Sequence, residues 1–191
     1  MLADTIFDKP AKSREPKQKK KIMDVIRFGG KEIEISEGDI TQVEADAIAS
    51  SDDSYLGMRG GVLGAILKAG GDIIWEETRK YVPAELGSAV VTSAGRLHAE
   101  YVIHSVIGDF DKGIMPDAHL VEKAVINCLN EAERLGCRTI AMPVLNVEYV
   151  IHAMTDTISR QLKSKANLQK VFIVLYEQDI LFDYLKASME K

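Results

Sequence analysis

Two polar segments of the chain are arranged so that they could hold an anion. Residues 50–54 (Ser-Ser-Asp-Asp-Ser) close an apolar run typical of a buried strand, and residues 59–62 (Arg-Gly-Gly-Val) open a helical pattern. Glycines at a helix N-terminus let backbone N–H groups approach an anion, and the helix dipole favours negative charge there. The two segments therefore predict a phosphate or diphosphate cradle. The alternative is that Gly60 and Gly61 only make a tight turn.

The glycine-rich segment differs from two common nucleotide-binding motifs. No Gly-Lys-Ser/Thr follows it, as it would in a P-loop, and the full Gly-x-Gly-x-x-Gly pattern is missing. Asp53 is the local side chain with the chemistry of a general base, which makes it the candidate catalytic residue. The alternative is that Asp52 and Asp53 only cap the loop through their carboxylates.

The histidines and cysteines indicate structural rather than chemical roles. Cys128 and Cys137 make no metal-ligand spacing, and no histidine forms a catalytic arrangement with either of them. His104 lies in an apolar strand pattern, so we expect a hydrogen-bonded core histidine. We therefore expect no metal and no cofactor. The low cysteine content also favours a reducing compartment, and we expect a cytoplasmic protein.

Strand and helix patterns alternate along the chain from residue 22 onward. Strand patterns occupy residues 23–28, 31–36, 45–50, 89–92, 101–106, 139–142 and 171–176. Helical patterns occupy residues 61–69, 72–81, 116–136, 148–162 and 179–189. We expect Gly29-Gly30 to join the first two strands in a hairpin and Asp72 to cap the second helix.

Helices between the later strands predict an α/β fold, in which a mostly parallel sheet carries helices on both faces. Ligands bind such sheets outside the carboxyl ends of the strands. Residues 38–41, 50–62 and 143–149 are therefore the segments expected to form a site.

Charge and hydropathy exclude several classes of partner. Residues 1–21 carry seven Lys and Arg against three Asp and Glu and contain few apolar residues, so we expect a disordered basic leader or linker. The net charge of −5 then leaves −9 for residues 22–191, which argues against a nucleic-acid groove. No apolar run approaches the ~20 residues of a membrane span, and residues 1–21 lack the apolar core of a signal peptide.

The order of several motifs resembles that of a macro domain. They are Gly-Asp-Ile-Thr at residues 38–41, Asp-Ala-Ile at 46–48, the loop at 50–62, Gly-Ala-Ile at 64–66 and Ile-Ala-Met-Pro at 140–143. The resemblance covers residues 22–191. It implies a three-layer α/β/α macro-domain fold with a central mixed, mostly parallel sheet.

The resemblance also implies a ligand. Macro domains bind ADP-ribose, and some members hydrolyse ADP-ribose 1″-phosphate, O-acetyl-ADP-ribose or mono-ADP-ribosyl protein bonds. The implied partner is thus ADP-ribose or a related small molecule, and an ADP-ribosylated protein is a further candidate. Carried over by motif, the ligand-binding residues are Asp39, Ile40, Ser50, Asp53, Arg59, Gly60, Gly61, Val62, Val144, Leu145, Asn146 and Tyr176.

Individual roles within this set follow from the same resemblance. Asp39 would accept a hydrogen bond from the adenine amino group, with the Ile40 backbone beside the ring. The alternative for Asp39 is a turn cap before Thr41. Tyr176 would place its ring against adenine, or it is a core residue at the end of a strand.

Two departures from the family pattern bear on activity. Ser50 and Asp53 stand where the family has paired asparagines, and ionised Asp53 accepts but cannot donate hydrogen bonds to a ribose. Arg59 replaces a loop glycine and would either pair with Asp53 or a phosphate, or block the cradle.

The stretch after Pro143 reads Val144-Leu145-Asn146 and lacks the glycines of the family's second phosphate loop. Either that loop is deleted, or residues are missing from the sequence at this point. The departures define the alternative function, which is a degenerate, non-catalytic macro domain acting as a protein-interaction or regulatory module.

Overall fold

The computed structural model describes residues 21–57, 60–144 and 148–176. The strands are β1 (Lys21–Phe28), β2 (Lys31–Glu37), β3 (Ala47–Asp53), β4 (Ala89–Ser93), β5 (Tyr101–Gly108), β6 (Thr139–Pro143) and β7 (Lys170–Leu175). The helices are α1 (Gly61–Gly70), α2 (Ile73–Thr78), α3 (Ala118–Arg134) and α4 (Glu148–Ser164). Three short 3₁₀ turns accompany them: η1 (Ile40–Gln42), η2 (Arg79–Tyr81) and η3 (Phe110–Lys112).

The strands form one mixed sheet in the order β1-β2-β7-β6-β3-β5-β4. Every neighbouring pair from β2 to β5 is parallel, whereas β1 pairs with β2 and β4 with β5 in antiparallel fashion. The expected mixed, mostly parallel sheet is therefore confirmed. Because the parallel strands run the same way, the carboxyl ends of β3, β5, β6 and β7 meet at one edge.

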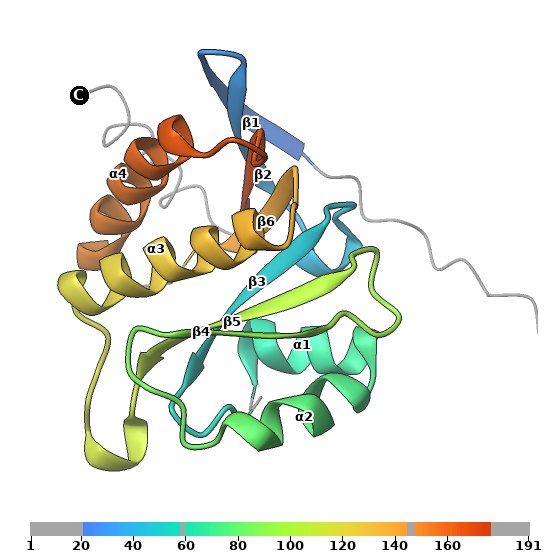
Figure 1. The fold of residues 1–191 in the computed structure, drawn as a ribbon, viewed down its shortest axis with the longest axis vertical. Helices are drawn as coiled ribbons and strands as arrows, with labels where there is room; N and C mark the ends of the chain where they lie inside the picture. Colours follow the sequence, from blue (N-terminus) through green and yellow to red (C-terminus); the bar gives the residue numbers. More distant parts are fainter. Residues whose placement is uncertain (1–20, 58–59, 145–147, 177–191) are drawn as a thin grey trace, which may run out of the picture.

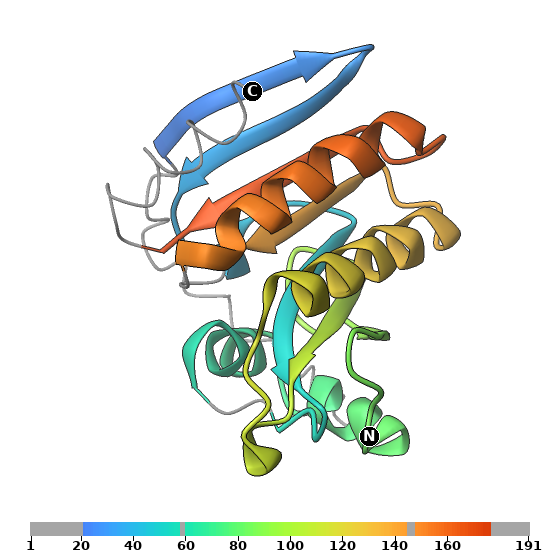
Figure 2. The same ribbon diagram turned by 90° about the vertical axis from the view of Figure 1, so that its left-hand side faces the viewer.

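Helices cover both faces of the sheet, which gives the expected three-layer α/β/α architecture (Figures 1 and 2). Alternation along β3 shows how the layers are held. Ala47 and Ala49 point into the apolar core beneath α3 and α4, whereas Ile48 points into a second core with Leu63 and Ile66 of α1. Successive residues of β3 thus pack against helices on opposite faces of the sheet.

The elements expected within the described residues are present, with ends that differ by up to three residues from the sequence prediction. One local prediction was confirmed and two were wrong. Gly29 and Gly30 join β1 to β2 with φ of 57° and 81°, as a two-residue hairpin requires. Asp72, expected to cap the second helix, has helical backbone angles itself and makes no capping side-chain hydrogen bond. Lys21, expected in the leader, is the first residue of β1. The leader at 1–20 and the helix expected at 179–189 lie outside the described residues.

The helix expected between Pro116 and Gly136 is α3. Its N-terminus is capped by Asp117, whose Oδ1 accepts a hydrogen bond from the Leu120 N–H at 2.7 Å. After its end Gly136 has a φ of 75°, a conformation that favours glycine. The apolar stripe seen in the sequence is the buried face of this helix.

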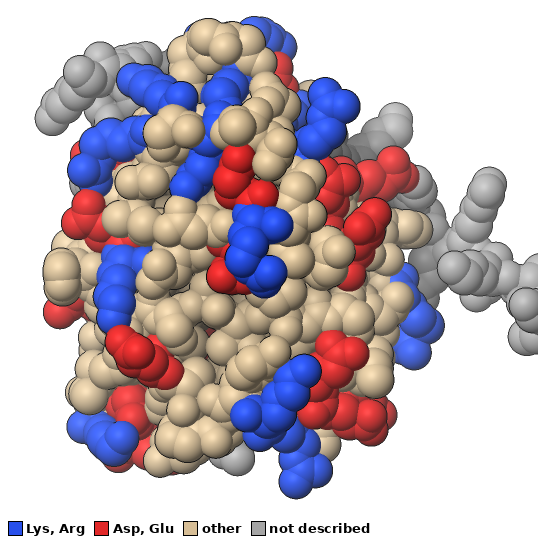
Figure 3. All heavy atoms as spheres, viewed as in Figure 1, with Lys and Arg blue, Asp and Glu red and all other residues tan. Residues whose placement is uncertain are grey.

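Positive and negative side chains are interspersed on the face of the molecule that carries α3 and α4 (Figure 3). This face therefore shows no continuous basic surface of the kind that follows a nucleic-acid backbone. None of the helices in the described ranges is long and apolar enough to cross a membrane.

Candidate ligand-binding cleft

Two cavities lie at the carboxyl edge of the sheet and share part of their walls. The first, of about 400 Å³, lies by β7 and η1, and the second, of about 630 Å³, lies by β3 and η3. Gly61, Val62, Pro143 and Val144 line both of them. The two cavities therefore form one cleft that passes the N-terminus of α1.

Asp39 stands in the wall of the first cavity. Its Oδ1 accepts hydrogen bonds from the Thr41 N–H at 2.9 Å and from the Thr41 hydroxyl at 2.8 Å, so the residue caps η1. The cap expected as the alternative role is thus present. Both of these bonds use Oδ1, which leaves Oδ2 as the oxygen suited to accept from a ligand.

Tyr176 and Ile40 complete the apolar part of the first cavity. Tyr176 follows β7 and is 70% exposed, so the alternative of a core residue at the strand end is wrong. Ile40 is buried, and its aliphatic side chain forms an apolar part of the wall of the first cavity. An exposed aromatic ring beside a buried aliphatic side chain is a suitable surface for a planar base.

The N-terminus of α1 lies where the cavities meet. Gly60 and Gly61 have φ of 74° and 52°, so the tight turn expected as one alternative is present. No described side chain caps this helix, and its first intrahelical bond from this end is that of the Gly64 N–H to the Gly60 carbonyl, at 2.9 Å. The preceding N–H groups have no intrahelical partner and are available to an anion.

Asp53 lines the second cavity at the end of β3. Its Oδ1 accepts a hydrogen bond from the Tyr55 N–H at 3.0 Å, and Asp52 Oδ1 accepts one from the Asp53 N–H at 2.9 Å. Both carboxylates therefore cap the loop, as the alternative expected. Asp53 is also placed where it can face a ligand.

The segment after β5 forms a wall of the second cavity that sequence reasoning missed. Phe110 and Asp111 of η3 line the cavity together with Ile107, and Tyr55 adds a second aromatic ring. Asp109 fixes this turn: Oδ1 accepts from the Lys112 N–H at 3.2 Å and Oδ2 from Lys112 Nζ at 2.8 Å. The hydrogen bond from Lys112 holds the pKa of Asp109 below its ordinary value despite desolvation.

Ser50 is not brought to the cleft, which corrects its assignment as a ligand contact. It is 1% exposed, and its hydroxyl lies 3.1 Å from His104 Nδ1. Thr92 Oγ1 lies 3.0 Å from Nε2 of the same ring. His104 is thus the hydrogen-bonded core histidine that was expected, and burial lowers its pKa to about 4. Among the described residues no three His, Cys, Asp or Glu side chains are grouped to hold a metal ion.

The remaining predicted contacts divide into two groups. Gly60, Gly61, Val62 and Val144 are placed in the cavity walls. Arg59, Leu145 and Asn146 lie outside the described residues, so their predicted roles stay predictions.

Comparison with protein families gives a match to the Macro domain model over residues 50–150. An uncharacterized protein of Pyrobaculum aerophilum is 38% identical over 170 residues, which cover 83% of this chain and 92% of that protein. An uncharacterized protein of Saccharolobus solfataricus is 39% identical over 167 residues, with the same shares covered.

Solved structures give the same fold. The Oceanobacillus iheyensis macrodomain with ADP superposes with a TM-score of 0.76 at 20% identity, covering 91% of this chain and 97% of that one. The Trypanosoma brucei macrodomain in complex with ADP-ribose gives a TM-score of 0.72 at 19% identity, covering 82% and 68%.

Proposed function

Because the chain belongs to the macro domain family, we propose that its cleft binds ADP-ribose. Adenine occupies the first cavity, the diphosphate lies at the N-terminus of α1, and the distal ribose enters the second cavity. The observation that carries this proposal is the continuity of the cavities across that N-terminus, with Asp39 at one end and Asp53 at the other. The ADP and ADP-ribose complexes of the two structural neighbours support it.

Adenine recognition rests on one polar and two apolar groups. Asp39 Oδ2 accepts a hydrogen bond from the exocyclic amino group, while Oδ1 keeps its bonds to Thr41. The Tyr176 ring packs against the base, and Ile40 limits the cavity on the side of the sheet. A ligand without an adenine amino group would lose the first of these contacts.

The diphosphate is held by backbone rather than by side chains in the described part of the site. Free N–H groups at the start of α1 donate to the phosphate oxygens, and the helix dipole stabilises their negative charge. Gly60 and Gly61 have no Cβ, and open space surrounds the positions where one would be. The phosphates can therefore approach the backbone closely.

Hydrolysis of an ADP-ribose derivative is a second proposal, and it rests on Asp53. A carboxylate in the cavity assigned to the distal ribose takes a proton from the attacking water. With a mono-ADP-ribosyl protein that water attacks the anomeric carbon and the protein side chain leaves, whereas with O-acetyl-ADP-ribose it attacks the acyl carbon and acetate leaves. Incubation with O-acetyl-ADP-ribose and mono-ADP-ribosyl protein tests this proposal. Product formation that Asp53→Asn abolishes would support it, and no turnover of any substrate would contradict it.

Binding itself is tested by titration calorimetry with ADP-ribose, with AMP and ribose 5-phosphate as controls. We expect ADP-ribose to bind more tightly than either fragment, because each fragment fills one cavity only. No heat with ADP-ribose, together with no ligand-induced rise in melting temperature, would contradict the proposal. That outcome would favour the alternative of a degenerate module that binds protein partners.

A further inference from the structure

The second cavity is acidic as far as the structure describes it. Three carboxylates line it, from Asp52 and Asp53 at the end of β3 and from Asp111 in η3. No Lys, Arg or His is among the described residues of its lining. Asp52 is buried, so Asp53 and Asp111 are the two that can face an occupant.

The nearest lysine along this wall does not offset that charge. Lys112 Nζ pairs with Asp109 Oδ2 at 2.8 Å, and Asp109 is only 2% exposed. Together these two residues carry no net charge. Within the described ranges neither Asp53 nor Asp111 takes part in an ion pair.

Two aromatic rings accompany the carboxylates. Tyr55 is 42% exposed and Phe110 is 50% exposed, and both line the second cavity. The face of an aromatic ring attracts cations, and a guanidinium both stacks on such a ring and pairs with carboxylates through its planar N–H groups. Carboxylates beside open aromatic faces are therefore a combination suited to a guanidinium.

We propose that the second cavity selects ADP-ribose whose 1″ carbon carries a guanidinium, as in an ADP-ribosylated arginine side chain. This inference rests on the ADP-ribose site proposed above. The distal ribose lies beside Asp53, and the guanidinium lies between the carboxylates of Asp53 and Asp111 and the rings of Tyr55 and Phe110. A 1″-phosphate in the same place brings two negative charges to these carboxylates. The site therefore discriminates against it.

The test compares the dissociation constants of three ligands by titration calorimetry. These are ADP-ribose, ADP-ribose 1″-phosphate and ADP-ribosyl-agmatine, in which a guanidinium is attached at the 1″ carbon. We expect the agmatine conjugate to bind roughly tenfold more tightly than ADP-ribose, and the 1″-phosphate roughly tenfold more weakly, with both differences shrinking at high salt.

Variants of the cavity then identify the charges responsible. Asp53→Asn combined with Asp111→Asn should bring the three dissociation constants together. Asp72→Asn removes the same charge from an exposed position at the start of α2, and it should leave the order of affinities unchanged. The Asn variants keep the side-chain shape, and melting temperatures verify that each one is folded.

The possible results distinguish a failure of this inference from a failure of the proposed function. Equal binding of the three ligands to the unmodified protein, or tighter binding of the 1″-phosphate, would overturn this inference and leave the ADP-ribose site intact. An unchanged order of affinities in the double variant would also overturn it. Failure of ADP-ribose itself to bind would overturn the proposed function and this inference together.

Discussion

Asp39 and Asp53 each use one carboxylate oxygen to hold the backbone at an end of the cleft. Asp39 Oδ1 accepts from the N–H and hydroxyl of Thr41, and Asp53 Oδ1 accepts from the Tyr55 N–H. An Asp-to-Asn change keeps an oxygen for the backbone and replaces the other oxygen by an NH₂ group. It therefore separates the structural task of each residue from its task in binding.

Asp39→Asn should weaken ADP-ribose binding without destabilising the fold. The NH₂ group of the substituted side chain would face the adenine amino group, so two donors would meet where a charged acceptor stood. A hydrogen bond to a charged group is worth about 1.5–3 kcal/mol, so we expect a ten- to hundredfold rise in Kd by titration calorimetry.

A comparison of melting temperatures provides the control for this variant. Asp39→Ala also removes the cap of η1, so its melting temperature should fall, whereas that of Asp39→Asn should stay close to the unmodified value. Unchanged ADP-ribose affinity in Asp39→Asn would assign Asp39 to the cap alone.

Ser50→Ala should reduce stability and leave ligand affinity unchanged. The Ser50 hydroxyl is buried against His104 Nδ1, and its removal leaves a buried ring nitrogen without that partner. We expect a loss of about 1–3 kcal/mol in the free energy of unfolding, measured by urea denaturation. A loss of ADP-ribose affinity at full stability would instead restore Ser50 to the binding site.

The pairing of β3, β5 and β4 encloses a histidine that makes stability depend on pH. Burial lowers the pKa of His104 to about 4, whereas an unfolded histidine has a pKa near 6.5. Between these values the unfolded chain binds the proton and the folded chain does not. The free energy of unfolding should therefore fall as the pH drops from 6.5 to 4, by on the order of 3 kcal/mol.

Urea denaturation across this pH range tests the effect. His104→Gln keeps a hydrogen-bonding group between Ser50 and Thr92 but cannot titrate, so its stability should depend less on pH. The exposed His98 offers the matched control, and His98→Gln should retain the full dependence. Equal slopes for the unmodified protein and His104→Gln would show that His104 is not the responsible group.

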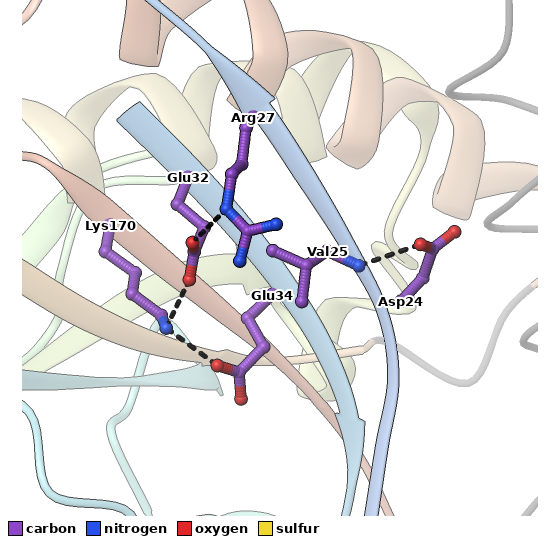
Figure 4. Close-up of polar contacts among 6 residues, drawn as sticks. All are labelled: Asp24, Val25, Arg27, Glu32, Glu34 and Lys170. Atoms are coloured by element: carbon purple, nitrogen blue, oxygen red, sulfur yellow. Dashed lines mark hydrogen bonds and ion pairs between the residues drawn. The ribbon is translucent and has the colours of Figure 1, made fainter. Parts of the chain in front are cut away.

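The edge formed by β1, β2 and β7 carries a charge network on one face (Figure 4). Lys170 of β7 pairs with Glu32 and with Glu34 of β2, the latter at 2.7 Å, and Arg27 of β1 bonds to Glu32 at 2.9 Å. The Glu34 side chain is only 6% exposed. Its pairing with Lys170 therefore ties the antiparallel hairpin to the parallel part of the sheet.

Lys170→Met should destabilise the protein, because the buried Glu34 carboxylate would lose its ion pair with the Lys170 ammonium. We expect a loss of about 2 kcal/mol in chemical denaturation. Arg27→Met is the matched control: its side chain is 70% exposed, so its loss should cost under about 1 kcal/mol. Equal effects of the two substitutions would contradict a special role for the buried pair.

The elements that sequence reasoning located are those with strong local periodicity. The apolar stripe of α3 and the hairpin glycines Gly29 and Gly30 are local signals, and the structure confirms both. Asp72 shows the limit, because it directly precedes α2 but already has helical backbone angles and makes no capping side-chain hydrogen bond. The type of side chain alone does not specify the residue at which helical backbone angles begin.

Sequence reasoning missed the wall of the second cavity that follows β5, because the position of this wall depends on the order of the strands and not on a local sequence pattern. Phe110 and Asp111 reach the cavity because β5 lies parallel to β3, which brings their carboxyl ends together. A strand order cannot be read from one segment. The Asp-Phe-Asp-Lys-Gly turn after an apolar strand was the available signal. Ser50 was assigned to the ligand from its place in the motif, but the structure buries its hydroxyl against His104 of β5.

At the level of the whole molecule, the sheet brings distant segments to one edge. Asp39, the start of α1, Asp53 and Tyr176 are separated along the chain, yet the cleft at the carboxyl ends of the parallel strands unites them. The family resemblance predicted this site because its motifs follow in the order that the fold needs. The acidic and aromatic character of the second cavity comes from Asp53, Asp111, Tyr55 and Phe110, which line it.

An amide chemical-shift titration with ADP-ribose tests the central claim most directly, because it reports both binding and location. We predict shifts at both ends of the cleft, around Thr41 and Tyr55, and at the start of α1. AMP should shift only the residues around the first cavity and the start of α1. No shifts with ADP-ribose, or shifts confined to residues outside the two cavities, would contradict the account.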